Sequence, residues 1–132
     1  MRRIPVASAI LLLNVAMMAV PAQAEKNNLS ATYTNCMDNS GGVTFDMIEC
    51  TPEEHEKQDK RLNSAYKQAL KAVGDRANTL KEVQRAWLKY RDLTCGFAGG
   101  AEGSSARIIG SSCFLQMTAE RADELQDIAK NQ

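Results

Sequence analysis

A stripe of five residues at helical spacing most constrains what this chain can fold into. Leu80, Gln84, Trp87, Arg91 and Cys95 are three or four residues apart, so their side chains share one face of a predicted helix. Arg91 stands on this face where an apolar residue is expected, and burying an unpaired charge is costly. The stripe therefore predicts a long helix whose buried face needs polar partners from elsewhere in the chain.

The first 24 residues have the pattern of a secretory signal peptide. Residues 1–3 are basic, residues 4–20 form an apolar run, and residues 22–24 fit the small-x-small pattern of a cleavage site. The run is too short for a membrane anchor and is followed at once by that site. We expect cleavage before Glu25, which leaves a single domain of residues 25–132 in the periplasm or outside the cell.

The charge balance of the expected mature chain excludes one class of partner. Removing Arg2 and Arg3 changes the balance from 16 basic and 16 acidic residues to 14 basic and 16 acidic. Proteins that bind nucleic acid need a basic excess for their phosphate contacts, so no nucleic-acid partner is expected. No segment after the signal peptide is apolar enough to span a bilayer.

All four cysteines lie in the expected mature chain. An even number of cysteines in a small exported domain indicates two disulfides, and three pairings are open. We favour Cys36–Cys50 and Cys95–Cys113 because each closes a short loop, with roughly 3 kcal/mol of stabilisation apiece. There is no Cys-x-x-Cys pair and the single histidine, His55, is not spaced for ligation. We therefore expect no metal, no redox centre and no cofactor.

The periodicity of apolar residues predicts an all-α fold. Three main helices are expected at about residues 52–73, 77–97 and 105–129, and their short connections place successive helices antiparallel in a small bundle. Two disulfides would staple this bundle.

Local signals mark where the first main helix should begin. Thr51 and Glu54 have capping-box spacing, and Pro52 suits the first helical position. Residues 25–43 are polar and contain paired glycines, so they are predicted to form an irregular arm held by Cys36.

Each predicted helix places polar residues on its apolar stripe. The residues of this predicted core polar network are Asp59, Asn63, Gln84, Trp87, Arg91, Thr118 and Arg121. The Asp59 carboxylate would face the guanidiniums of Arg91 and Arg121 in an ion network that sets helix register. Removing Asp59 would then strand two positive charges and destabilise the fold strongly. An anchor for an anionic ligand is the alternative role for this network.

Candidate partner-binding residues lie on the last helix and in the segment before it. Glu120, Glu124 and Asp127 follow helical spacing and form either a solvated face or a surface that steers a cationic partner. Arg107 lies in a segment rich in glycine and serine. His55 lies one turn before Asp59, but catalysis needs a nucleophile or a metal beside such a pair, so no enzyme activity is expected.

An ordered series of motifs spans most of the chain. The series is Cys50, then Asp59-x-x-Leu62-Asn63-x-x-Tyr66, then Gln84-x-x-Trp87-x-x-Tyr90-Arg91-x-x-x-Cys95, then Cys113-x-x-x-x-Thr118-x-x-Arg121-x-x-x-Leu125. It resembles the lysozyme inhibitor LprI-like N-terminal domain family over about residues 36–128. The resemblance implies a small, exported, helical, disulfide-bonded domain that inhibits lysozyme. Pro52 departs from the family pattern, and the chain lacks the lipid-attachment cysteine of a lipoprotein member.

We therefore expect an exported, non-enzymatic protein that binds and inhibits a lysozyme-type muramidase. The acidic face would attract a cationic lysozyme, and Arg107 would enter its acidic cleft. The alternative is a structural or interaction module of the cell envelope that binds another protein without inhibiting it.

Overall fold

The fold consists of helices throughout the part of the chain that a computed structural model describes, residues 28–131. The predicted signal peptide lies outside these residues. In order, the elements are α1 (Ala31–Asn39), α2 (Thr44–Ala72), the short 3-10 helix η1 (Gly74–Arg76), α3 (Ala77–Ala98) and α4 (Ser104–Lys130). The predicted all-α class is confirmed, with four helices in place of three.

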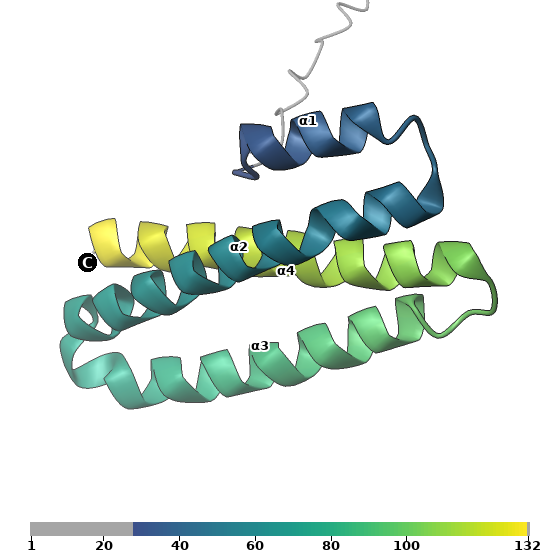
Figure 1. The fold of residues 1–132 in the computed structure, drawn as a ribbon. Coiled ribbons are helices and arrows are strands. Elements are labelled where there is room, and N and C mark those ends of the chain that lie inside the picture. Colours follow the sequence, from purple (N-terminus) through teal and green to yellow (C-terminus); the bar gives the residue numbers. More distant parts are fainter. Residues whose placement is uncertain (1–27, 132) are drawn as a thin grey trace, which may run out of the picture.

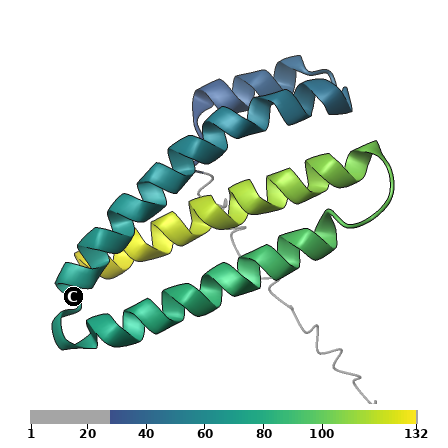
Figure 2. The ribbon, with the colours of Figure 1, turned by 60° about the horizontal axis from the view of Figure 1, so that its bottom comes forward.

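Helix α4 lies between α2 and α3, and α1 lies along the first half of α2 (Figures 1 and 2). Helices α2 and α4 run in the same direction, whereas α3 runs antiparallel to both. The helices converge where η1 joins α2 to α3, which we call the hairpin end. They spread apart at the opposite end, which holds both disulfides and which we call the disulfide end.

The apolar core lies in the half of the molecule nearer the hairpin end. Small and branched side chains from three helices are buried there, namely Leu62, Ala65, Ala69, Leu80, Ala122 and Leu125. Alanine at three of these positions lets α2 and α4 pack closely, because the side chains at a contact set the distance between helix axes.

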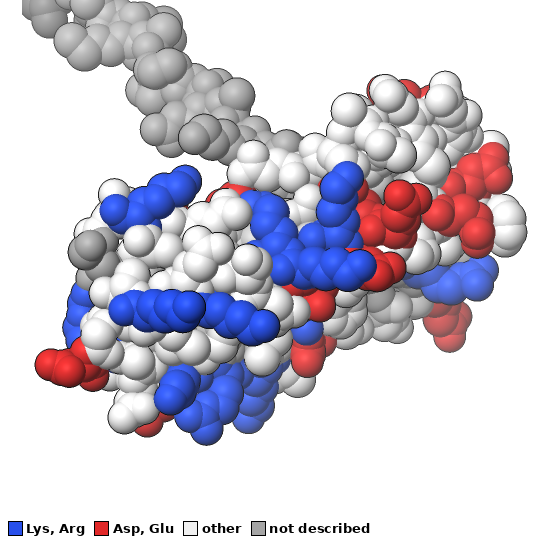
Figure 3. Space-filling model, turned by 60° about the vertical axis from the view of Figure 1, so that its left-hand side comes forward, with Lys and Arg blue, Asp and Glu red and all other residues white. Residues whose placement is uncertain are grey.

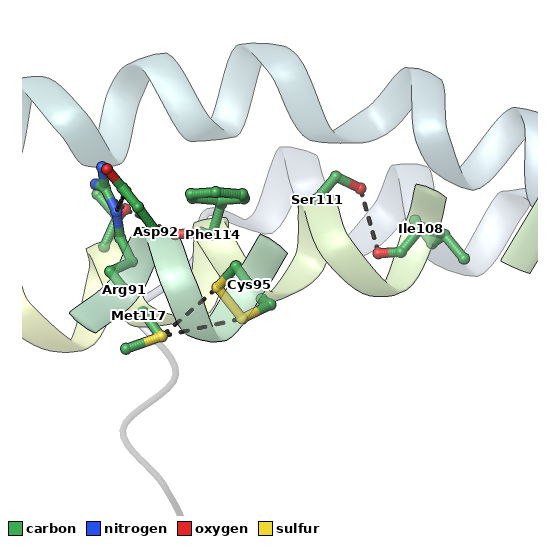
Figure 4. The surroundings of a disulfide bond; sticks show 9 residues. Arg91, Asp92, Cys95, Ile108, Ser111, Phe114 and Met117 are labelled. Atoms are coloured by element: carbon green, nitrogen blue, oxygen red, sulfur yellow. Dashed lines mark hydrogen bonds and ion pairs between the residues drawn. A yellow bond between two sulfur atoms is a disulfide. The ribbon is translucent and has the colours of Figure 1, made fainter. Parts of the chain in front are cut away.

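The predicted disulfide pairing is confirmed. Cys36–Cys50 joins α1 to α2, and Cys95–Cys113 joins α3 to α4. The Met117 sulfur lies 3.6 Å from the Cys95 sulfur and 3.9 Å from that of Cys113, in contacts that cover the second disulfide (Figure 4). Each disulfide thus ties one neighbouring helix to the α2–α4 pair.

Two predictions about the start of the fold are wrong. The expected irregular arm contains helix α1, whose first turn is capped by the Ser30 hydroxyl. Helix α2 begins at Thr44 rather than near residue 52 and continues through Pro52. Thr51 is therefore a buried residue inside the helix, where its hydroxyl donates to the Met47 carbonyl at 3.3 Å.

Packing explains why Pro52 does not end the helix. The Cys36–Cys50 disulfide and α1 hold the turns before Pro52, so the ring costs one hydrogen bond without separating the two halves. Figure 2 shows the first turns of α2 running at an angle to the rest, as expected for a helix with an internal proline.

None of the described helices is long and apolar enough to cross a membrane.

The closest approach of α3 to α4 yields a stability prediction. A Cβ atom on Gly110 would lie 3.1 Å from the Gly99 Cα, whereas a Cβ on Gly96 would meet nothing within 4 Å. We expect Gly110→Ala to lower the free energy of unfolding by about 1–3 kcal/mol, since backbone would have to move. Gly96→Ala should raise it by up to about 1 kcal/mol, because alanine is the better helix former. Urea denaturation measures both, and equal effects would contradict the close approach.

Candidate functional site

The spreading of the helices leaves two hollows at the disulfide end, one on each side of α4. Ser111 and Phe114 of α4 line both hollows. The hollow toward α2 has a volume of about 290 Å³, and that toward α3 has a volume of about 380 Å³. Figure 4 shows Phe114 projecting from α4 toward α2. Together the hollows form an open recess with α4 as its floor.

The α2 side of this recess is mainly apolar. Ile48, Pro52 and His55 line it, and the backbone there lacks one donor because proline has no N–H. The Nε2 atom of His55 is buried and has no hydrogen-bond partner among the described residues. Ser111 lies in the same hollow, but its hydroxyl donates to the Ile108 carbonyl at 3.2 Å. Nucleophilic catalysis needs a nucleophile hydrogen-bonded to its base, and these two side chains do not form that bond.

The α3 side of the recess contains Arg107. Its other lining includes Cys95, Gly99 and Gly110, where α3 and α4 approach most closely. Arg107 is exposed in the first turn of α4 and forms no ion pair within residues 28–131. A cation in the first turn opposes the helix dipole, so Arg107 does not serve the stability of α4.

Acidic side chains surround the disulfide end. The segment from residue 28 to residue 56 contains six acidic residues and no lysine or arginine. Five of the six are exposed, and these are Asp38, Asp46, Glu49, Glu53 and Glu56. This one-sided charge gives that half of the molecule a negative field that attracts cationic partners.

The other predicted partner-binding residues lie apart from Arg107. Glu120, Glu124 and Asp127 line a separate hollow of about 410 Å³ together with Asp123. At 1.5 Å per helical residue, these acids lie roughly 20–30 Å along α4 from Arg107. Helical spacing also places them on the opposite side of α4. Arg107 and this acidic face therefore do not form one compact contact surface.

Five residues of the predicted core polar network are brought together by α3 and α4. The Arg121 Nε donates to the Gln84 amide oxygen at 3.0 Å, and its Nη1 bonds to Glu124 at 2.6 Å. Arg91 Nη1 donates to the Thr118 hydroxyl at 3.3 Å.

The indole ring of Trp87 contacts both guanidiniums of this cluster. The Cζ atoms of Arg91 and Arg121 lie 5.1 Å and 5.7 Å from the centre of the ring, within the range of cation–π attraction. This ring, with the hydrogen bonds to Gln84 and to the exposed Glu124, lets Arg121 stay 8% exposed without a buried carboxylate.

Asp59 and Asn63 do not belong to this cluster, and the predicted ion network is wrong. Asp59 accepts a hydrogen bond from the exposed Asn63 at 3.0 Å and forms no ion pair in the described part of the chain. The buried stripe of α2 instead passes through Thr51, Glu54 and Gln58, which lie on the side facing α1 and α4.

The ion pair that joins α2 to α4 has the opposite polarity to the predicted one. Arg61 of α2 pairs with Asp123 of α4, and Arg61 Nη2 also donates to the Ala119 carbonyl at 2.8 Å. Its Nε donates to the Gln58 amide oxygen at 2.7 Å.

Sequence reasoning also missed the buried carboxylate of Glu54. Glu54 accepts from the Ser30 N–H at 2.8 Å and from the Gln58 amide at 2.6 Å, and the Ser30 hydroxyl donates to its second oxygen. Burial raises the pKa of Glu54, but the hydrogen bonds from Ser30 and Gln58, with the Lys57 charge, outweigh it and hold the pKa below its ordinary value. The available signal is the spacing of Glu54 from Thr51, which by itself predicts a helix cap.

Residues 28–131 contain no group of His, Cys, Asp and Glu side chains that could hold a metal ion. Comparison with known proteins identifies a family and a relative. The family model described as lysozyme inhibitor LprI matches residues 36–125. An uncharacterized protein of Rhizobium meliloti (strain 1021) is 28% identical over 103 residues, which cover 66% of this chain and 74% of that protein. No solved structure matches.

Glu54 makes stability depend on pH. Its pKa is lower in the folded state, so its contribution is present above the unfolded pKa of about 4.3 and is lost as the pH falls through the folded pKa. We expect Glu54→Gln to lower the free energy of unfolding by about 1–2 kcal/mol at pH 7. The difference from wild type should shrink at pH 3, and urea titrations at the two pH values measure it. A difference that is constant with pH would contradict this assignment.

The corrected network gives a second prediction. Asp59→Ala should change the free energy of unfolding by less than about 0.5 kcal/mol, since the one hydrogen bond of Asp59 within the described residues is to the exposed Asn63. Arg121→Ala should cost at least about 2 kcal/mol, because it removes a buried stem and leaves Gln84 without its donor. Thermal unfolding of the two variants compares them directly. A larger loss in Asp59→Ala would restore the ion network predicted from the sequence.

Proposed function

The chain belongs to the lysozyme inhibitor LprI family, and on this premise we propose that it is an exported protein that binds and inhibits a lysozyme-type peptidoglycan hydrolase. The family match is the observation that carries the proposal. It spans α2, α3, most of α4 and both disulfides, so it includes the whole framework of the disulfide end.

We assign the inhibitory contact to the disulfide end. Two disulfides hold its helices, and a preorganised surface loses less entropy on binding than a mobile one. Large apolar side chains are exposed there, with Phe97 at 90% and Phe45 at 67%, and Ile109 is half exposed. Aromatic residues and arginine are enriched among the side chains that dominate protein interfaces.

The charges at this end suit a lysozyme. Glycoside hydrolases cleave with a pair of carboxylates in a cleft, and a guanidinium can bind a carboxylate with two parallel hydrogen bonds. Arg107 is the basic residue that we assign to this contact. The acidic residues of α1 and the first half of α2 would speed the encounter with a cationic enzyme. In this proposal, the acidic residues of α1 and α2 take the attracting role that the sequence analysis gave to Glu120, Glu124 and Asp127. Those three residues lie farther along α4, on its other side.

We further propose that inhibition occurs by binding and not by catalysis. His55 is the one histidine of the chain, and Ser111 beside it donates its hydroxyl to a backbone carbonyl instead. The apolar lining of their hollow is suited to a side chain of a partner.

A titration of the purified protein into lysozyme reactions tests this function. The exported form is added to suspensions of cell wall with lysozymes of several types, and clearing is followed by turbidity. We expect inhibition to increase with the molar ratio. Arg107→Glu should weaken it at least about tenfold, since a charge in the cleft would be reversed. Lys71→Glu makes the same change of charge at the hairpin end and should match wild type.

Each outcome of this titration has a separate meaning. No inhibition of any lysozyme type at large molar excess would reject the inhibitory function. Inhibition that is equal for wild type and Arg107→Glu would reject the assigned surface alone. Recovery of another envelope protein by a chain without inhibitory activity would favour an interaction module.

A further inference from the structure

The charges of this protein are segregated between its two ends. Residues 28–56 carry six acidic residues and no lysine or arginine, whereas residues 57–91 carry ten basic and three acidic residues. Because the chain turns back at η1, the second half of α2 and the first half of α3 place their charges at the same end. Figure 3 shows Lys and Arg side chains gathered mostly over the hairpin end, and Asp and Glu mostly toward the other end.

Six basic residues, five near the hairpin end and one just past the middle of α3, form what we call the hairpin patch. Its members are Lys67, Lys71, Arg76, Lys81, Arg85 and Lys89. All six are exposed, and none forms a salt bridge within the described residues. Elsewhere most basic side chains are paired, including Lys60 with Glu56 and Lys130 with Asp127. The hairpin patch thus holds positive charge that no acidic side chain of the described residues neutralises.

An apolar hollow lies at the same end as the hairpin patch. It has a volume of about 240 Å³ and is lined by Val73, Leu80, Val83 and Ile128, with Arg76 at its side. Val83 is 46% exposed, although it lies beside the core. Of the six basic residues only Arg76 lines this hollow, and at about 100° per residue Lys81 and Arg85 lie on the other side of α3 from Val83. The basic side chains therefore surround the hollow when the molecule is viewed along its helices. Basic side chains around exposed apolar ones are typical of surfaces that lie in the interface of a membrane.

We propose that the hairpin end docks on the surface of a membrane that contains anionic phospholipids. Lysine and arginine near such a surface are attracted by its negative potential. In an end-on contact, the basic side chains around the hairpin end would lie at the level of the headgroup phosphates, and Val83 with its hollow would face the boundary with the acyl chains. This contact would direct the disulfide end away from the membrane.

The structure favours a membrane over a soluble polyanion as the partner. A flexible anionic polymer long enough to pass the hairpin end would meet the acidic half of α2, which repels it. A flat surface contacts one end of the molecule only. A phosphate polymer also has no group that would fill an apolar hollow.

Vesicle sedimentation tests this docking. The exported form from Glu25 is used, because the apolar signal peptide would itself bind lipid and this form contains the four helices of the described residues. Vesicles of phosphatidylcholine with about 30% phosphatidylglycerol are compared with vesicles of phosphatidylcholine alone. We expect binding to the anionic vesicles only, with a loss of about tenfold or more when salt is raised from low to high concentration.

Two double variants with the same change in net charge identify the surface. Lys71→Glu with Arg85→Glu alters the hairpin patch and should weaken vesicle binding about tenfold or more. Lys57→Glu with Arg107→Glu alters exposed residues outside the patch and should change it less than about twofold. Val83→Ser should weaken binding while leaving its salt dependence unchanged, since it removes apolar contact alone. Circular dichroism establishes that each variant is folded.

Three results would overturn the docking proposal. Equal binding to neutral and anionic vesicles would exclude headgroup recognition. Equal loss in the two double variants would show that net charge, and not the hairpin patch, is responsible. Displacement by soluble polyphosphate at the same phosphate concentration, with no effect of Val83→Ser, would assign the patch to a soluble polyanion. None of these results depends on whether the protein inhibits lysozyme.

Discussion

The close packing of α2 on α4 is the constraint on which the rest of this fold depends. Ala65 and Ala69 of α2 and Ala119 and Ala122 of α4 are all buried, so the two backbones approach closely at the hairpin end. Helix α3 then packs chiefly on α4, where Gly99 and Gly110 bring their backbones into contact. Because α4 is covered on two sides by diverging helices, its face between them stays uncovered at the disulfide end. The recess around Phe114 and Ser111 follows from this geometry.

The buried charged side chains on the two sides of α4 are stabilised by different partners. Toward α3, Arg121 is neutralised at the surface by Glu124 and rests against Trp87, so no carboxylate needs to enter the core. Toward α1, the carboxylate of Glu54 is buried and is held by three hydrogen bonds from Ser30 and Gln58. That arrangement attaches the start of α1 to α2 one helical turn after the Cys36–Cys50 disulfide. Helix α1 is thus held at two neighbouring points, although none of its own residues is buried.

The segregation of charge suggests a division of roles between the two ends of the molecule. The disulfide end is rigid, acidic and apolar in places, and it carries Arg107, which suits recognition of a cationic enzyme. The hairpin end has unpaired basic residues beside an apolar hollow, which suits an anionic surface. The two surfaces lie at opposite ends of α4, so occupation of one would leave the other free.

The sequence by itself determined the helical class and the family, and it favoured the disulfide pairing that the structure confirms. Apolar periodicity is local, short loops favour local disulfides, and the motif series from Cys50 to Leu125 depends only on spacing. The stripe from Leu80 to Cys95 also placed Gln84 and Arg91 correctly, because α3 meets a single partner over most of its length. On α2, in contrast, the side chains of Glu54 and Asp59 are separated by less than half a turn around the helix axis. The sequence pattern alone therefore does not show which of the two faces a neighbouring helix. Only the tertiary structure decided that choice, because α1 and α4 together cover the side of α2 that carries Glu54 and Arg61. The packing of α1 on α2 also explains why α2 continues through Pro52, where the local signals alone predict a helix start.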